Sequence, residues 1–286
     1  MIDRIALGTA QFGLPYGITN NNQVSMIEIR DIIEFAESKG MDTLDTAISY
    51  GDCHERLGLL DLSDWKVITK LPKIDEKTID IIKWIRDHID QSLRDLNLSS
   101  IDAVLLHNPD DLLGPDGNRV WFELDELKRK GKIKKIGFSI YEVSELEELL
   151  LNFDPDIVQA PYNILDQSLV TSGWLEKMKQ LGIQVHVRSI FLQGLLLMSK
   201  SDRPEKFNKW SQLWGRWDNW LEENKVEPLH ACLAFANAET QIDRIIIGVN
   251  SLNHLKEIAY LENSNLRNFP ENIESNDSNL INPSRW

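Results

Sequence analysis

The chain has 286 residues and a formal net charge of −14, and 42% of its residues are hydrophobic. This is the composition of a globular protein with a large core, and the negative charge argues against nucleic acid or an anionic membrane surface as partner. The two cysteines, Cys53 and Cys232, lack the spacing of a disulfide framework or a zinc site. The amino terminus enters a strand at once rather than a leader-like apolar run. We therefore expect a soluble, cytoplasmic protein without a metal.

Short apolar runs alternate with segments of helical periodicity along the chain. We predict strands over residues 4–9, 43–46, 66–71, 103–107, 134–140, 157–160, 184–190 and 244–249. A helical run follows each strand, and capping boxes at Ser25 with Glu28 and at Ser144 with Glu147 mark the starts of two of these helices. After the first strand, the residues GTAQFG lack the glycine fingerprint of an open dinucleotide-binding sheet. Eight such units predict a closed (β/α)₈ TIM barrel.

Two segments interrupt this alternation. An insertion of about residues 199–225 after the seventh strand holds Trp210, Trp214, Trp217 and Trp220, three of them at helical spacing. We expect a helix that packs on the barrel through tryptophan, and a lid over the barrel mouth is the alternative. Residues 263–286 are polar and rich in asparagine, which is typical of a loop or tail. The predicted organisation is a barrel over residues 1–262 followed by a C-terminal tail over residues 263–286.

Four chemically active side chains lie at or just beyond the ends of three successive predicted strands. Asp45 closes the second strand with Tyr50 in the loop after it, Lys70 lies near the end of the third, and His107 ends the fourth. A parallel β/α fold gathers its chemistry at this edge. A phenol donates a proton to a developing alkoxide more readily when a nearby ammonium raises its acidity. Each residue alone could be a cap, a turn former or a surface group, but their joint placement favours a catalytic site.

The residues around this site resemble the aldo-keto reductases, in particular the short bacterial branch. The stretch DTAISYGDCHERLG matches the family's DTA, YG and LG pattern, and GTAQFG, LLHNP, GFS, VQAPYN, FLQGLL and IIGVNSLNHLKE extend the match over about residues 4–260. The resemblance implies an NAD(P)H-dependent carbonyl reductase in which Tyr50 donates the proton. Lys70 would lower the pKa of this tyrosine, Asp45 would hold the lysine, and His107 would orient the carbonyl oxygen. No metal is implied.

The resemblance also assigns residues to the cofactor. Those at the nicotinamide and its ribose would be Ser139, Gln159, Arg188, Gly8, Thr9 and Ala10. Those along the pyrophosphate and adenosine would be Leu192, Gln193, Gly194, Gly248, Asn250, Ser251, His254 and Glu257. Arg188 stands where relatives often carry an aromatic that stacks on the nicotinamide, and a guanidinium plane can also stack. We expect NADPH as cofactor, with NADH also accepted because Asn250 and Ser251 stand where many relatives have Lys or Arg.

The substrate is expected to be a small-molecule carbonyl compound. Tryptophan planes in the insertion beside the amides of the tail suggest a surface for a sugar-derived carbonyl. Two alternatives from other classes are a non-redox lyase or isomerase that uses Lys70 as an amine nucleophile, and a non-catalytic relative that senses nucleotides. The sequence carries no signal for an oligomeric state.

Overall fold

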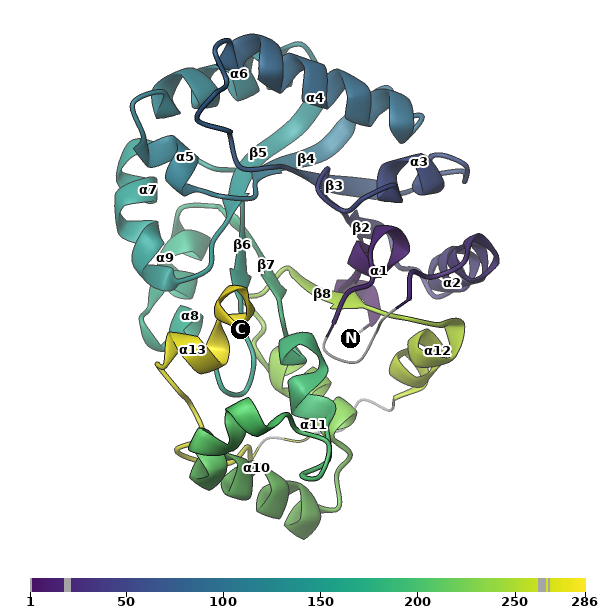
Figure 1. The fold of residues 1–286 in the computed structure, drawn as a ribbon, viewed down its shortest axis with the longest axis vertical. Helices are drawn as coiled ribbons and strands as arrows, with labels where there is room; N and C mark the ends of the chain where they lie inside the picture. The colour runs from purple at the N-terminus through teal and green to yellow at the C-terminus, as the bar shows by residue number, and fades with distance from the viewer. Residues whose placement is uncertain (1, 18–21, 262–265, 267) are drawn as a thin grey trace.

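The computed structural model describes residues 2–17, 22–261, 266 and 268–286. Eight parallel strands form a closed barrel in sequence order, with β8 pairing back onto β1 (Figure 1). The strands are β1 (Ile5–Gly8), β2 (Thr43–Asp45), β3 (Lys66–Leu71), β4 (Ile101–Leu106), β5 (Ile133–Ser139), β6 (Ile157–Pro161), β7 (Gln184–Arg188) and β8 (Arg244–Gly248). The predicted (β/α)₈ barrel is confirmed, with every strand within a few residues of its expected position.

The inside of the barrel is divided into layers by the two-residue period of its strands. Ile68, Leu105 and Ile157 belong to a small apolar cluster that is separate from the main core. Side chains alternate between the two faces of a strand, so the next positions on the same face are Lys70, His107 and Gln159. The carboxyl ends of β3, β4 and β6 therefore place polar groups directly above an apolar layer.

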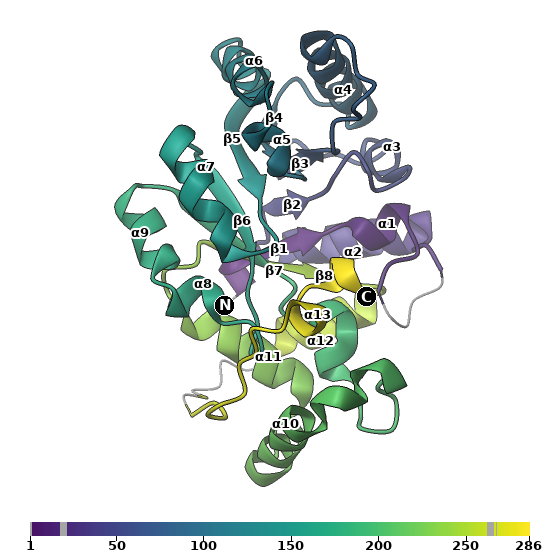
Figure 2. The same ribbon diagram turned by 60° about the vertical axis from the view of Figure 1, so that its left-hand side comes forward.

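Helices surround the strands (Figures 1 and 2). Their buried side chains are mostly apolar and belong to the main core. They are α1 (Ala10–Gly13), α2 (Met26–Ser38), α3 (Cys53–Leu57), α4 (Ile81–Asp95), α5 (Asp110–Leu113), α6 (Gly117–Arg129), α7 (Leu146–Asn152), α8 (Ser168–Thr171), α9 (Trp174–Gln180), α10 (Ser211–Asn224), α11 (Pro228–Ala238), α12 (Leu252–Tyr260) and α13 (Ser278–Ile281). The 3-10 turns are η1 (Ile2–Arg4), η2 (Val143–Glu145), η3 (Leu192–Leu197), η4 (Glu205–Trp210) and η5 (Pro283–Arg285). Within the described ranges, no helix combines the length and apolar character that a bilayer crossing requires.

The two predicted capping boxes have different outcomes. Ser25 caps α2 as expected, since its hydroxyl accepts the N–H of Glu28 at 3.2 Å. The box at Ser144 and Glu147 is wrong, because the reciprocal pair is Glu142 with Glu145, two residues earlier. The Glu145 carboxylate accepts the N–H of Glu142 at 2.6 Å, which starts a 3-10 turn before α7. Ser144 lies inside that turn and caps nothing.

The tryptophans of the insertion pack inward. Trp214 and Trp217 on α10 are buried, and their indole N–H groups donate to the carbonyl oxygens of Phe207 and Leu196. Trp210 donates to Asp277, and Trp220 donates to the carbonyl of Asn268, so both bind the C-terminal segment. The predicted helix that packs on the barrel through tryptophan is confirmed.

The C-terminal segment is more structured than the expected loop or tail. Ile273 and Leu280 are fully buried, and the segment contains α13 and η5. It returns to the barrel, where the N–H of Ser275 donates to Leu165 at 2.7 Å and Arg285 forms an ion pair with Glu142 at 3.0 Å. These contacts tie it to the loops after β6 and β5. The predicted boundary at residues 262 and 263 lies outside the described residues.

Candidate active site

A buried ion pair lies where β2 and β3 end. The Lys70 ammonium donates to Asp45 Oδ2 at 2.7 Å and to the carbonyl oxygen of Thr46 at 2.9 Å, and only 1% of the lysine is exposed. The other Asp45 oxygen accepts Gln159 Nε2 at 2.7 Å. Burial lowers the pKa of Lys70, and Asp45 opposes that shift by favouring the ammonium. Because an ammonium has three hydrogens, one remains beyond these two bonds.

Tyr50 and His107 lie above this pair. Lys70 Nζ is 5.4 Å from the centre of the Tyr50 ring, and the Tyr50 and His107 ring centres are 6.0 Å apart at an interplanar angle of 80°. The Ser49 hydroxyl lies 3.3 Å from His107 Nδ1. Burial lowers the pKa of His107 to about 3, with smaller contributions from the charges of Lys70 and Arg188. The imidazole is therefore neutral at physiological pH, and the four residues predicted from the sequence lie together.

The expected acidity of Tyr50 needs correction. Burial raises the pKa of Tyr50 well above its usual 10, the charge of Asp45 adds to the rise, and Arg188 opposes it. The physical reason is that a buried phenolate would lose the water that stabilises its charge. Asp45, whose Oδ2 is 2.7 Å from Lys70 Nζ, also offsets the charge of the ammonium. The phenol is therefore held in its protonated form.

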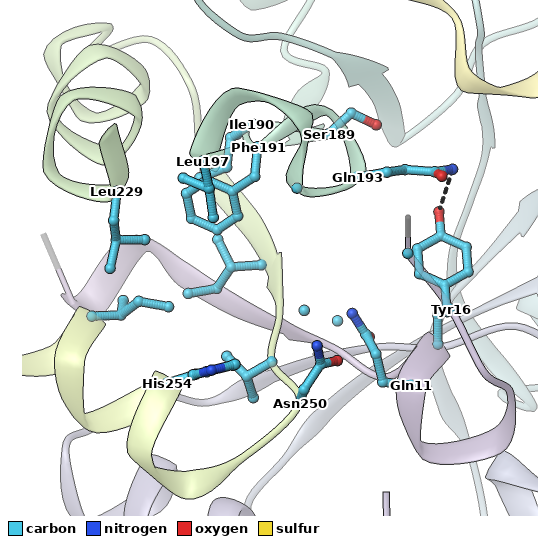
Figure 3. Close-up of a pocket in the computed structure, with 18 of the residues that line it drawn as sticks. Gln11, Tyr16, Ser189, Ile190, Phe191, Gln193, Leu197, Leu229, Asn250 and His254 are labelled. Carbon is cyan, nitrogen blue, oxygen red and sulfur yellow. Dashed lines mark hydrogen bonds between the residues drawn. The ribbon is translucent and has the colours of Figure 1, made fainter. Parts of the chain in front are cut away.

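A cavity of about 670 Å³ leads away from this group. Its lining contains twelve of the residues predicted for the site, namely Gly8, Thr9, Ala10, Asp45, Tyr50, Arg188, Gln193, Gly194, Gly248, Asn250, His254 and Glu257. The sequence reading missed other lining residues, among them Gln11, Phe191, Asp202, Glu227 and Leu229, several of which are labelled in Figure 3. Gln11 could have been found from its place directly after the GTA motif. Asp202 and Leu229 come from the insertion and α11, where no motif marks them.

Six predicted residues do not line this cavity. Lys70 and His107 belong to the polar group described above, and Ser139 and Gln159 are buried and hydrogen-bonded to each other at 3.1 Å. The Leu192 side chain is fully buried in the hydrophobic core, and the Ser251 hydroxyl caps α12.

Arg188 connects the cavity with the buried polar network. Its Nη2 donates to the carbonyl of Ile140 at 2.8 Å, and its Nε lies 3.4 Å from the Ser139 hydroxyl. The guanidinium carbon is 4.9 Å from the centre of the Tyr141 ring. A hydrogen-bonded chain thus runs from Arg188 through Ser139 and Gln159 to Asp45.

Two loops meet across the cavity. The Tyr16 hydroxyl, from the loop after β1, accepts Gln193 Nε2 from the loop after β7 at 3.5 Å (Figure 3). Leu192, Gln193 and Gly194 have φ values of 48°, 53° and 94°, so three consecutive residues adopt the left-handed region. Non-glycine residues rarely adopt it, and such strain concentrates at sites that clamp ligands.

The cavity fits an elongated nucleotide cofactor. Its volume lies within the range of small-molecule sites, and Tyr50 is part of its lining. Gln11 lines the cavity, and its buried Oε1 accepts no hydrogen bond from any residue that the structure describes, so this acceptor is available to a bound ligand. Leu197 and Leu229 provide an apolar part of the wall for a planar ring (Figure 3). Among the residues the structure describes, no group of His, Cys, Asp or Glu side chains could hold a metal ion.

A closed parallel barrel with a cavity at the carboxyl ends of its strands is the arrangement in which (β/α)₈ enzymes hold their active sites. The chain belongs to the aldo/keto reductase family, whose model matches residues 4–269.

Curated relatives match part of the chain. An NADH-specific methylglyoxal reductase of Escherichia coli is 34% identical over 39% of this chain and 34% of its own length. A glyoxal reductase of Bacillus subtilis is 33% identical over 45% of this chain and 46% of its own. The chain thus spans between a third and a half of these relatives.

Solved structures share the fold over most of the chain. An aldo-keto reductase from Bacillus halodurans in its holo form has a TM-score of 0.70 at 20% identity, covering 90% of this chain and 85% of that one. A glycerol dehydrogenase from Gluconobacter oxydans has a TM-score of 0.67 at 20% identity, over 90% of this chain and 85% of that one.

Proposed function

We propose that the protein reduces an aldehyde or ketone to an alcohol with a nicotinamide cofactor, and that Tyr50 is the general acid. The observation that carries this proposal is the buried Asp45–Lys70 pair beneath a protonated tyrosine, with the neutral His107 facing its ring. The family membership supports the reaction class. The two bacterial relatives, reductases by name, support it too.

Each residue has a role that its surroundings suit. The reduced cofactor would supply a hydride to the carbonyl carbon. His107, neutral and oriented by Ser49, would donate a hydrogen bond to the carbonyl oxygen. Tyr50 would pass its proton to that oxygen as negative charge develops, which completes the alcohol. The third hydrogen of Lys70 would favour the resulting phenolate, and Asp45 would keep the ammonium charged and in place.

The cofactor would lie along the cavity with its nicotinamide at Tyr50. Ser139 and Gln159 would hold the carboxamide, with Arg188 beside them. The residues proposed for the ribose, pyrophosphate and adenosine are Gly8, Thr9, Ala10, Gln193, Gly194, Gly248, Asn250, Ser251, His254 and Glu257. Leu192 would act through its strained backbone, because its side chain is in the core.

For the substrate we propose a short hydrophilic carbonyl compound. The tryptophan surface that suggested a sugar is not formed, since Trp214 and Trp217 are buried and none of the four insertion tryptophans lines the cavity. The groups near Tyr50 are instead polar, namely Tyr16, Ser49 and Arg188. A small dicarbonyl, the substrate class in the names of the two bacterial relatives, suits such groups, and so does a short sugar aldehyde.

The other two function classes gain no support. A lyase that used Lys70 as a nucleophile would need a free amine, but this side chain is buried and tied by two hydrogen bonds. A non-catalytic sensor would not need to keep an acid, its ion pair and a neutral imidazole together.

The test is the Tyr50→Phe variant. It should lose turnover of glyoxal and methylglyoxal at least a hundredfold, which is the usual contribution of a general acid. Its affinity for the reduced dinucleotide should stay unchanged in a fluorescence titration, because the hydroxyl acts on the transition state. Tyr260→Phe is the matched control, since this tyrosine is 64% exposed on α12. Near-normal turnover by Tyr50→Phe would disprove the proposed acid.

A further inference from the structure

The lining of the cavity contains three acidic side chains besides Asp45. Asp202, Glu227 and Glu257 all belong to its lining. Asp202 is oriented by the Ser199 hydroxyl, which donates to its Oδ2 at 2.6 Å. Within the described part of the chain, Arg188 is the one Lys or Arg in the lining, and it lies near enough to Tyr50 to affect the pKa of that tyrosine. An additional phosphate group on the cofactor, such as the 2′-phosphate of NADPH, would therefore meet more carboxylates than cations in this cavity.

The amino terminus of α12 is already satisfied by an anion of the protein itself. Such a helix end is a ready site for phosphate, because its first N–H groups lack partners in the helix. Here the N–H of Leu252 donates to Glu28 Oε1 at 2.5 Å, and the N–H of His254 donates to the Ser251 hydroxyl at 3.2 Å. Glu28 belongs to α2, far away in sequence. Its carboxylate accepts one of the free N–H groups at the start of α12 and lies at the positive end of the helix dipole. Both would otherwise stabilise a bound phosphate.

The start of α12 follows β8, where the adenosine would bind, and the three carboxylates line the same cavity. A ribose with free hydroxyls can donate hydrogen bonds to carboxylates such as Asp202. A 2′-phosphate cannot, and it carries about −1.5 to −2 charges near neutral pH. Beside these carboxylates, the ribose with free hydroxyls would be bound and the ribose with a 2′-phosphate would be repelled.

We propose that this chain selects NADH over NADPH, with Glu28 and Asp202 as the residues that decide between them. The inference rests on the proposed use of a nicotinamide cofactor in this cavity. Glu28 fills the anion position at the start of α12, and Asp202 accepts a hydrogen bond from the adenosine ribose. The sequence suggested NADPH as the cofactor, with NADH also accepted because of Asn250 and Ser251. The proposed preference for NADH replaces that expectation.

The test measures dissociation constants of NADH and NADPH for the whole protein, from the fluorescence of the bound reduced nicotinamide. NADH should bind at least tenfold more tightly. Glu28→Gln should raise NADPH affinity roughly two- to fivefold, the contribution of one anion at a helix amino terminus, and leave NADH unchanged. Asp202→Asn should weaken NADH and strengthen NADPH. Glu34→Gln, on the exposed side of the same helix, makes the same charge change and should alter neither constant.

Ionic strength gives a readout that needs no variant. Added salt screens repulsion, so the NADH preference of the unaltered protein should shrink as salt rises. NADPH that binds as tightly as NADH, or a preference that grows with salt, would overturn the inference while leaving the reductase proposal intact. Binding of neither dinucleotide would instead defeat the reductase proposal.

Discussion

Asp45→Asn should destabilise the fold strongly, although it changes one atom type. Both neighbours of this carboxylate are donors, since Lys70 and Gln159 each give it a hydrogen bond at 2.7 Å. An amide has a single acceptor oxygen, so its NH₂ would face one of these donors, and the ammonium would stay buried without its counter-charge. Removing one partner of a buried ion pair costs about 3–5 kcal/mol. At about 2–4 °C per kcal/mol for a protein of this size, the melting temperature should fall by roughly 6–20 °C.

The assay is a melting curve followed by circular dichroism for four proteins in a double-mutant cycle. Lys70→Met added to Asp45→Asn removes the stranded ammonium, so the double variant should be more stable than the sum of the two single losses predicts. The matched control is Asp87→Asn, which breaks the exposed Lys83–Asp87 pair on α4 and should leave the midpoint unchanged. Strict additivity in the cycle, or an Asp45→Asn midpoint equal to that of the control, would refute the reasoning.

Two further predictions concern acid stability and cofactor release. Burial lowers the pKa of His54 to about 4 and those of His107 and His186 to about 3, so the unfolded state binds more protons below pH 6.5. The stabilising contribution of these neutral imidazoles is full above pH 6.5 and falls toward pH 4, by about 1.4 kcal/mol per pH unit for each proton. Urea titrations across this range should show the loss, and His54→Gln should lower the slope by about one proton; an unchanged slope would contradict it. Tyr16→Phe should speed release of the dinucleotide in stopped flow, because it removes the contact with Gln193 across the cavity; an unaltered release rate would show that this contact does not hold the ligand.

The barrel could be predicted because its sequence pattern of strands and helices is periodic. Apolar strands recur with helical runs between them, and the right residues then meet because parallel strands end at one edge. Asp45, Tyr50, Lys70 and His107 were found for this reason, although they come from three separate strands and their loops. The capping box before α7 was misplaced because Glu142 caps the 3-10 turn that precedes the helix, whereas Ser144, two residues later, also fitted the sequence pattern.

The features that the sequence did not predict depend on burial and on contacts between segments far apart in the chain. The fully buried Ile273 and Leu280 sit in a polar stretch, so composition alone predicted a loop. The raised pKa of Tyr50 depends on burial, which the sequence does not display. The hydrogen bond that the N–H of Leu252 donates to Glu28 joins residues far apart in sequence, and no local sequence pattern predicts it.

Transfer of deuterium from the reduced nicotinamide to the product tests the central claim most directly. The protein would be given the dinucleotide carrying deuterium on the reactive face of C4, with methylglyoxal in ordinary water, and the product analysed by mass spectrometry and NMR. The account predicts one deuterium, bound to the former carbonyl carbon, in each alcohol formed by the unaltered protein. An alcohol without deuterium, or deuterium incorporated without net reduction, would contradict direct reduction by the bound cofactor.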